Sequence, residues 1–321
     1  MARPKLSVVI PTRNRPEAVR ETLAPLFAQE LPAADYEIIV VDDGSTPPLA
    51  IPGLPSAPKT TLLGTTGLER SAARNAGAAA AQGDVLLFLD DDITVDARFL
   101  GLHAAAQAEW PGAIAVGRIA LPPASLDAPF SRFRQRLEEQ GRPRERGPVA
   151  ARNFCTAANM SISRDAFLRL GGFDPALPSG EDQDLALRHT ASGGLLVHVP
   201  DAIGIHRDVT DLAGYCRRTE WGSEHLVAFS RKHPAWADSV DRERVNGPLR
   251  WGREPLRLSL SKLAKAALSS RLICAGLIGA ARAVEGSRPG GSGPERLYAL
   301  LIGLHVFRGY RTGLQRRDSR T

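Results

Sequence analysis

The stretch Gly83–Asp92, GDVLLFLDDD, constrains the fold more than any other part of this sequence. An apolar run bounded by glycine and by charge is typical of a strand that is buried on both faces in a parallel sheet. Three carboxylates follow, and close like charges stay ionised together only where water or a cation faces them. Open α/β sheets place their ligands at the carboxyl ends of parallel strands. We therefore expect a cation near Asp90, Asp91 and Asp92, with a solvated acidic turn as the alternative.

A second predicted strand, YEIIVV at residues 36–41, also ends in carboxylates, Asp42 and Asp43. Two acidic strand ends at what should be one sheet edge favour the cation over the solvated turn. Hard oxygen ligands suit Mg²⁺ or Mn²⁺, which fill their remaining positions with water and substrate phosphates. The expected cofactor is therefore Mg²⁺ or Mn²⁺.

The first predicted strand, residues 6–10, is closed by Pro11, and the turn Thr12–Arg15 leads into a helix over about 17–29. This turn lacks the G-x-G-x-x-G pattern of a dinucleotide fold, which argues against NAD or FAD. Its backbone and polar side chains could still hold a nucleotide base. A nucleotidyltransferase that forms sugar nucleotides would instead need a glycine-rich, basic phosphate loop here.

The rest of the first two-thirds alternates between predicted helices and strands. Strands are expected at 60–63, 113–119, 154–162 and 195–200, and helices at about 97–109, 164–170 and 181–188, with an alanine-rich helix up to Gly83. Residues 121–149, rich in Pro, Arg and Glu, predict a mobile connection or a substrate-covering loop, with a solvated charged face as the alternative. Glu181 and Asp182 fit the first turn of a helix, where the helix dipole favours anions.

Six motifs, weak alone but specific in this order, resemble the family-2 glycosyltransferases with the GT-A fold over residues 5–207. They are VIPTRNR at 9–15, IVVDDGS at 39–45, ARNAG at 73–77, FLDDD at 88–92, GGFD at 171–174 and GEDQDL at 180–185. The resemblance implies a Rossmann-like, mostly parallel sheet flanked by helices. It also implies a catalytic domain at 1–208, with a nucleotide-sugar half to about 118 and an acceptor half from about 119. A helical extension would occupy 209–321.

The same resemblance implies an inverting transfer of one sugar from a UDP-, GDP- or dTDP-linked donor to an acceptor hydroxyl on a glycan, a lipid-linked molecule or a small molecule. It assigns the general base to Asp182, with Glu181 beside it. Donor binding would fall to Pro11, Thr12, Arg13, Asp42, Asp43, Arg74, Asp90 and Asp91. Metal binding would fall to Asp92, Asp90 and His206. The alternatives are the nucleotidyltransferase and a nucleotide-sugar-binding protein without turnover.

This chemistry is independently sensible. A cation neutralises the charge of a leaving diphosphate, and a carboxylate must take the proton of the attacking hydroxyl. One base on the far side of the sugar suffices, so the anomeric configuration inverts without a covalent intermediate. Processive members of the family carry a Q-x-x-R-W-like element and membrane spans. Residues 217–221, RRTEW, do not match that element, so we expect addition of single sugars.

The chain has 41 Lys and Arg against 35 Asp and Glu, and this excess favours anionic partners such as phosphorylated substrates or membrane surfaces. Three separated cysteines, no secretory signal and no apolar run of about 20 residues predict a cytoplasmic protein. Apolar helical stretches at 256–284 and 297–314 carry basic residues. They predict peripheral binding to the inner face of the cell membrane, or packing on the catalytic domain or in a homo-oligomer. We expect no nucleic-acid partner.

Overall fold

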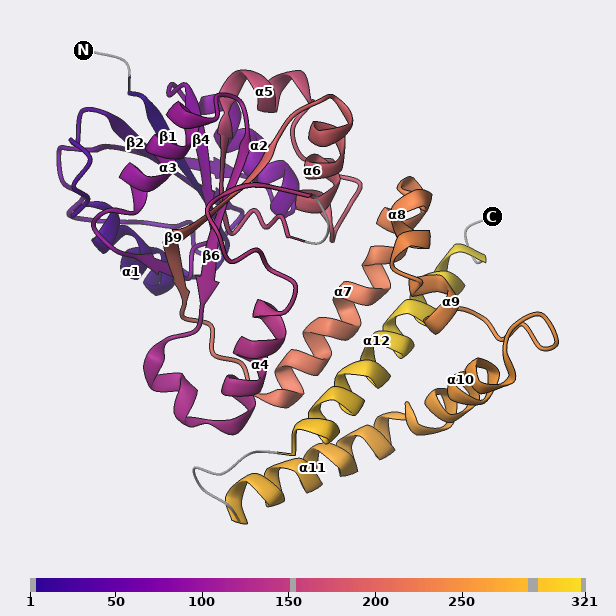
Figure 1. The fold of residues 1–321 in the computed structure, drawn as a ribbon. Helices are drawn as coiled ribbons and strands as arrows, with labels where there is room; N and C mark the ends of the chain where they lie inside the picture. Colours follow the sequence, from indigo (N-terminus) through magenta and orange to yellow (C-terminus); the bar gives the residue numbers. More distant parts are fainter. Residues whose placement is uncertain (1–3, 151–153, 288–293, 319–321) are drawn as a thin grey trace. The chain divides into compact units, whose positions relative to one another are not determined.

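The computed structural model describes residues 4–150, 154–287 and 294–318. The chain forms two compact units (Figure 1). The first combines Met1–Pro122 with Glu139–Asp208, and the second combines Pro123–Glu138 with Val209–Thr321. Pro123–Glu138 thus belongs to the second unit, although it lies between the two segments of the first.

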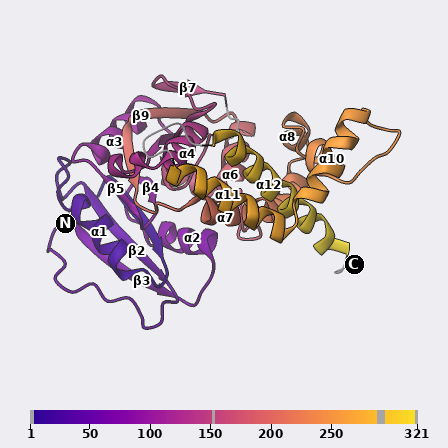
Figure 2. The ribbon, with the colours of Figure 1, turned by 90° about the horizontal axis from the view of Figure 1, so that it is seen from below.

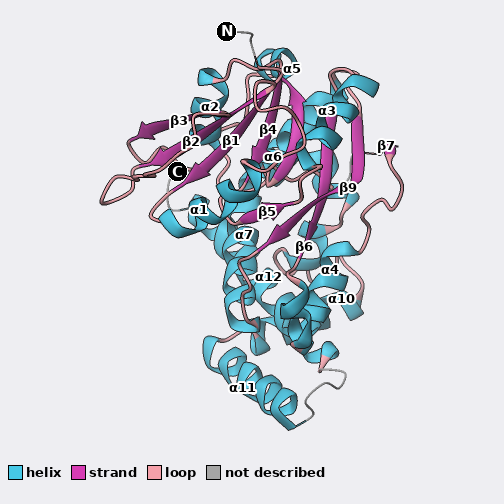
Figure 3. Ribbon diagram, turned by 90° about the vertical axis from the view of Figure 1, so that its left-hand side faces the viewer, coloured by secondary structure: helices cyan, strands magenta, loops and turns pink. Residues whose placement is uncertain are grey.

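A twisted sheet with strand order β3-β2-β1-β4-β8-β6-β9-β5 forms the centre of the first unit, and β7 pairs with β9 (Figure 3). The strands are β1 (Leu6–Thr12), β2 (Tyr36–Asp43), β3 (Lys59–Thr65), β4 (Val85–Leu89), β5 (Ile93–Val95), β6 (Ile114–Ala120), β7 (Gly147–Val149), β8 (Asn159–Ser163) and β9 (Leu196–His206). The strands β3, β2, β1 and β4 are parallel throughout. Beyond β4 the pairing is mixed, since β8 runs antiparallel to both β4 and β6 while β6 and β9 are parallel.

Helices cover both faces of this sheet, and the alternation of strand side chains explains why. On β4, Leu87 and Leu89 join the core under α1 (Pro16–Leu26) and α3 (Phe99–Glu109). Leu86 and Phe88 join the opposite core, under α2 (Arg70–Ala80), α5 (Arg164–Arg169) and α6 (Glu181–Ala191). Because successive side chains of a strand point to opposite faces, an uninterrupted apolar strand is stable only between two helical layers. The expected α/β class is confirmed.

Two local expectations are corrected. The segment 121–149 is not one long loop: it contains the 3-10 turn η1 (Pro123–Asp127), α4 (Pro129–Glu139) and β7. Burial of Phe130 on α4 in the core of the second unit accounts for its helical order. The strand expected over 154–162 is shorter, because regular pairing with β4 begins at Asn159.

The second unit is helical, which confirms the expected helical extension. Besides α4 it contains α7 (Leu212–Lys232), α8 (Pro234–Ser239), α9 (Arg242–Asn246), α10 (Leu256–Leu268), α11 (Arg271–Ser287) and α12 (Glu295–Asp318). The helices α7 and α12 lie side by side (Figures 1 and 2). Gly309 and Gly313 allow this close approach, since a Cβ at either would collide with the carbonyl oxygen of Glu220 or Glu224 on α7.

Candidate active site at the carboxyl edge of the sheet

Arg74 on α2 joins the two acidic clusters of the sequence. Its Nη2 donates to Oδ1 of Asp90 at 2.7 Å, and its Nη1 donates to Oε1 of Glu181 at 2.8 Å. Asp90 follows β4, and Glu181 opens α6. Burial alone would lower the pKa of Arg74, but the charges of Asp90 and Glu181 outweigh it and raise that pKa. The two clusters therefore form one site.

Asp91 points away from that pair, toward the turn after β1. Its carboxylate accepts from Oγ1 of Thr12 at 2.6 Å and from Nη1 of Arg15 at 2.8 Å. Burial raises the pKa of Asp91 to about 6, although Thr12 and Arg15 oppose the shift. Sequence reasoning did not select Arg15. The only signal for it was its place in the predicted nucleotide-binding turn.

Asp92 lies beside the end of β9. The backbone N–H of Arg207 donates to the carbonyl of Asp92, and Ile93 pairs with His206 across β5 and β9. Oδ1 of Asp92 is 3.3 Å from Nε2 of His206, and Oδ2 accepts from Nη2 of Arg15 at 2.9 Å. Burial pushes the pKa of Asp92 up, but His206 and Arg15 outweigh it and lower that pKa to about 2. Asp92 is thus held as a carboxylate.

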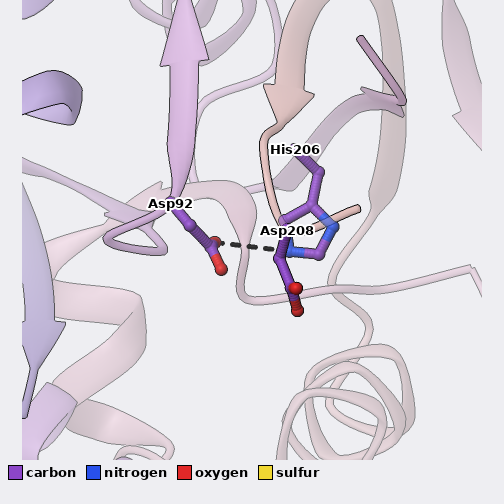
Figure 4. A group of neighbouring side chains, drawn as sticks. All are labelled: Asp92, His206 and Asp208. Atoms are coloured by element: carbon purple, nitrogen blue, oxygen red, sulfur yellow. Dashed lines mark ion pairs between the residues drawn. The ribbon is translucent and has the colours of Figure 1, made fainter. Parts of the chain in front are cut away.

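Asp92, His206 and Asp208 have the geometry of a metal-binding group (Figure 4). Each offers one ligand atom, and these atoms lie within 4.8 Å of one another. Oδ1 of Asp92 is buried, and it faces Nε2 of His206, another member of this group, at 3.3 Å. Asp90, which was expected to bind metal, is held by Arg74 and lies outside this group. Asp208 was not selected from the sequence, although it stands two residues after His206.

Asp182 lies in the first turn of α6, next to Glu181. Its Oδ1 accepts from the backbone N–H of Gln183 at 2.7 Å. Burial and the negative charge of Glu181 raise the pKa of Asp182 to about 7, against the opposing effects of the Gln183 N–H and Arg74. A carboxylate with a pKa near neutrality is suited to take a proton at the pH of a cell.

The two carboxylates at the end of β2 hold neighbouring loops. Asp42 accepts from the backbone N–H groups of Ser45 and Leu49, and these bonds lower its pKa although burial opposes the shift. Asp43 accepts from Oγ1 of Thr65 at 2.6 Å and from the N–H groups of Leu68 and Glu69. Both carboxylates therefore shape the edge of the site through the backbone.

The turn after β1 is tied to the turn after β2. The N–H of Asn14 donates to Oγ of Ser45 at 2.7 Å, and Oδ1 of Asn14 accepts from the N–H of Thr46 at 2.8 Å. Pro11 and Thr12 end β1 beside Asp42, and the guanidinium of Arg13 lies 3.6 Å from where a Cβ of Gly67 would stand. The residues expected to hold the base and ribose are thus neighbours along one edge.

This fold and site define an α/β protein whose polar site, rich in carboxylates and arginines, lies at the carboxyl edge of its parallel strands. The sequence pattern described as Glycosyl transferase family 2 matches residues 7–171, and the chain belongs to this family. The resemblance to the family-2 glycosyltransferases is therefore confirmed.

Two curated relatives illustrate the range of the family. An uncharacterized glycosyltransferase of Haemophilus influenzae is 29% identical over 57% of this chain and 61% of its own length. The pre-mycofactocin glycosyltransferase of Mycobacterium tuberculosis is 26% identical over 71% of this chain and 48% of its own length. The match thus spans less than two-thirds of either relative.

Solved structures confirm the GT-A-type fold. The mannosyltransferase PcManGT from Pyrobaculum calidifontis, in complex with GDP-Man and Mn²⁺, superposes with a TM-score of 0.56 at 21% identity, covering 96% of this chain and 87% of that one. TarS of S. aureus superposes with a TM-score of 0.52 at 19% identity, covering 97% and 55%.

Proposed function

We propose that this protein transfers one sugar from a nucleotide-diphosphate sugar to an acceptor hydroxyl, with inversion at the anomeric carbon and with the help of a divalent cation. One observation carries the proposal: Arg74 binds both Asp90 and Glu181, which brings the carboxylates after β4 to the helix that bears Asp182. Family membership and the sugar nucleotide bound by the related mannosyltransferase support the same reaction class.

Asp182 acts as the general base in this proposal. Its ionised carboxylate accepts the proton of the acceptor hydroxyl while the hydroxyl oxygen bonds to the anomeric carbon and the bond to the diphosphate breaks. The raised pKa, about 7, makes this carboxylate more basic than an ordinary aspartate. Because the displacement is a single step, no covalent nucleophile is required and the configuration inverts.

Asp92, His206 and Asp208 would hold Mg²⁺ or Mn²⁺, since their ligand atoms lie within 4.8 Å of one another and belong to residue types that bind these ions. The ion, when bound, supplies positive charge to the leaving diphosphate. Arg15 already reaches Asp91 and Asp92 from the turn after β1, so its guanidinium also lies where it can attract an anionic donor. Pro11, Thr12 and Arg13 would place the nucleotide along the same edge.

The Asp182→Asn variant tests the assignment of the base. With Mn²⁺ and the best donor from a panel of UDP-, GDP- and dTDP-sugars, we expect donor turnover to fall by about 10²- to 10⁴-fold. Thermal stabilisation by that donor should persist, because the variant keeps the donor-binding residues. Asp165→Asn, which changes an exposed acid in the first turn of α5, is the matched control. Wild-type turnover in Asp182→Asn would remove Asp182 as the base.

A further inference from the structure

Helix α10 in the second unit exposes leucine side chains and buries polar ones, which is the reverse of the usual pattern for a helix in a soluble protein. Leu256, Leu260 and Leu263 are 62%, 53% and 46% exposed, whereas Ser259 and Lys262 are 1% and 3% exposed. The three leucines stand at positions i, i+4 and i+7, which places them on one side of the helix. We call these three residues the leucine face. Helices of soluble proteins normally bury this stripe against the core.

A buried polar network fixes this orientation. Glu254, just before α10, accepts from Nζ of Lys262 at 2.5 Å and from Oγ of Ser259 at 3.0 Å. Lys262 also donates to the carbonyl of Pro248 at 3.0 Å. Turning α10 to bury its leucines would break this ion pair and leave the buried ammonium of Lys262 without its carboxylate. These polar contacts therefore hold the leucine face outward.

The exposed apolar surface continues on both sides of the helix in sequence. Trp251 precedes α10 and is 62% exposed, and Leu272 opens α11 and is 87% exposed. Large exposed apolar side chains therefore stand before, within and after α10 in the sequence.

The charged residues in the sequence around the leucine face are mostly basic. Residues 249–285 contain seven basic side chains and two acidic ones. Glu254 pairs with Lys262, and Glu285 accepts from the hydroxyl of Tyr298. Two of the other basic side chains, Arg250 and Arg282, pair with Glu243 and Asp211. Arg253, Arg257 and Arg271 are exposed and form no ion pair with any residue that the structure describes. This charge favours an anionic partner and opposes a second copy presenting the same face.

The geometry fits a helix lying on a surface better than one crossing a bilayer. Within the described residues no single helix is long and apolar enough to cross; α10 and α11 through Glu285 pass only when joined, and they are bent by 84°. The 13 residues of α10 extend about 20 Å, less than the ~30 Å of a hydrocarbon core.

We propose that α10 and the start of α11 dock this protein on an anionic lipid bilayer. The leucine face, Trp251 and Leu272 enter the boundary between headgroups and acyl chains, and Arg253, Arg257 and Arg271 meet the lipid phosphates. This role goes beyond the sugar transfer proposed above, because it concerns where the enzyme works and involves none of the catalytic residues.

Flotation of the full chain with vesicles tests the proposal without any activity assay. We expect binding to vesicles with 30 mol% (about one lipid in three) phosphatidylglycerol in phosphatidylcholine, little binding to pure phosphatidylcholine, and weaker binding as salt is raised. Changing Arg253, Arg257 and Arg271 together to Gln should weaken binding roughly a hundredfold, about fivefold for each charge. Changing the leucine face to Gln should weaken it by about tenfold or more.

Matched controls separate docking from misfolding. Leu168→Gln alters a leucine of similar exposure in the first unit and should float like the wild type. All variants should keep the wild-type melting temperature, because the altered side chains are exposed. On adding anionic vesicles, tryptophan emission should shift to the blue, and the Trp251→Phe variant should lose the shift.

Three results would overturn the proposal. The first is equal flotation of the wild type and the leucine-face variant. The second is a wild type that does not bind anionic vesicles. The third is a dimer in lipid-free buffer that the leucine-face variant abolishes, since a second copy would then cover this face.

Discussion

The guanidinium of Arg74 and the carboxylate of Glu181 meet at 2.8 Å across 107 residues of sequence. Arg74 is 2% exposed and its other arm binds Asp90, so one buried cation bridges two acidic segments. This relationship explains how Asp90 and the acidic start of α6 lie together in one site.

Removal of Arg74 should destabilise the fold. Arg74→Met leaves Glu181 buried without its cation, and we expect a loss of about 3–5 kcal/mol in the free energy of unfolding measured with urea. Arg74→Lys should lose less, because an ammonium keeps the charge without the two-armed geometry. Arg70→Met, at an exposed position of the same helix, should change stability by no more than about 0.5 kcal/mol. A fully stable Arg74→Met would mean that the pair contributes nothing to folding.

The rate should follow the ionisation of Asp182. Because the pKa of this base is raised to about 7, kcat/KM should rise with pH and level off above about pH 7. Below that value the rate should fall about tenfold for each pH unit. The measurement is donor turnover from about pH 5.5 to about pH 9 at saturating Mn²⁺. A rate that stays constant across this range, as expected for a base with the pKa of an ordinary aspartate, would contradict the assignment.

The same pKa makes a prediction for stability. Asp182 binds its proton more tightly in the folded state, so the stability from this proton is fully present below pH 3.8 and is lost as pH rises to about 7. Asp182→Asn lacks this titration. We therefore expect the free energy of unfolding of the variant, relative to that of the wild type, to increase by about 2 kcal/mol or more from pH 5 to pH 8. Urea unfolding at both pH values measures this, and a difference independent of pH would refute it.

Substitutions of Asp92 and Asp208 should weaken Mn²⁺ binding, whereas a substitution of Asp90 should not. Asp92→Asn and Asp208→Asn each remove a charged ligand oxygen and should weaken Mn²⁺ binding by about tenfold or more. Asp90→Asn should leave Mn²⁺ affinity within about threefold, because Asp90 is held by Arg74. Titration of the folded protein with Mn²⁺, followed calorimetrically, measures all three. Equal losses of Mn²⁺ affinity in Asp90→Asn and Asp92→Asn would instead support metal binding by both Asp90 and Asp92, as the family resemblance implies.

The packing of α2 on the sheet can be tested at Gly77. A Cβ there would collide with Cγ1 of Val9 and lie 2.9 Å from Cγ2 of Val41, so Gly77→Ala should cost about 1–3 kcal/mol. Gly101→Ala on α3 is the matched change, since nothing lies within 4 Å of its Cβ. It should stabilise by about 0.5–1 kcal/mol through helix propensity. Thermal unfolding of both variants decides the point, and a loss at both positions would show that α2 packing is not the cause.

The sequence by itself determined the α/β class, the position of most elements and the edge at which the acids gather. These depend on local patterns: an apolar run such as residues 85–89 dictates a strand buried on both faces, and the carboxylates after it must then lie at the strand's end. The family resemblance also rested on short motifs that need no long-range contact.

Only the tertiary structure decided which partner each carboxylate contacts. Asp90, Asp91 and Asp92 are adjacent in sequence, yet they face Arg74, Thr12 and His206, which come from three other segments. The register of β5 on β9 and the burial of Arg74 set these partners, and neither is written in a local pattern. The outward orientation of the leucine face also depends on tertiary contacts. The ion pair between Glu254 and Lys262, rather than the periodicity of the leucines, determines which side of α10 faces inward.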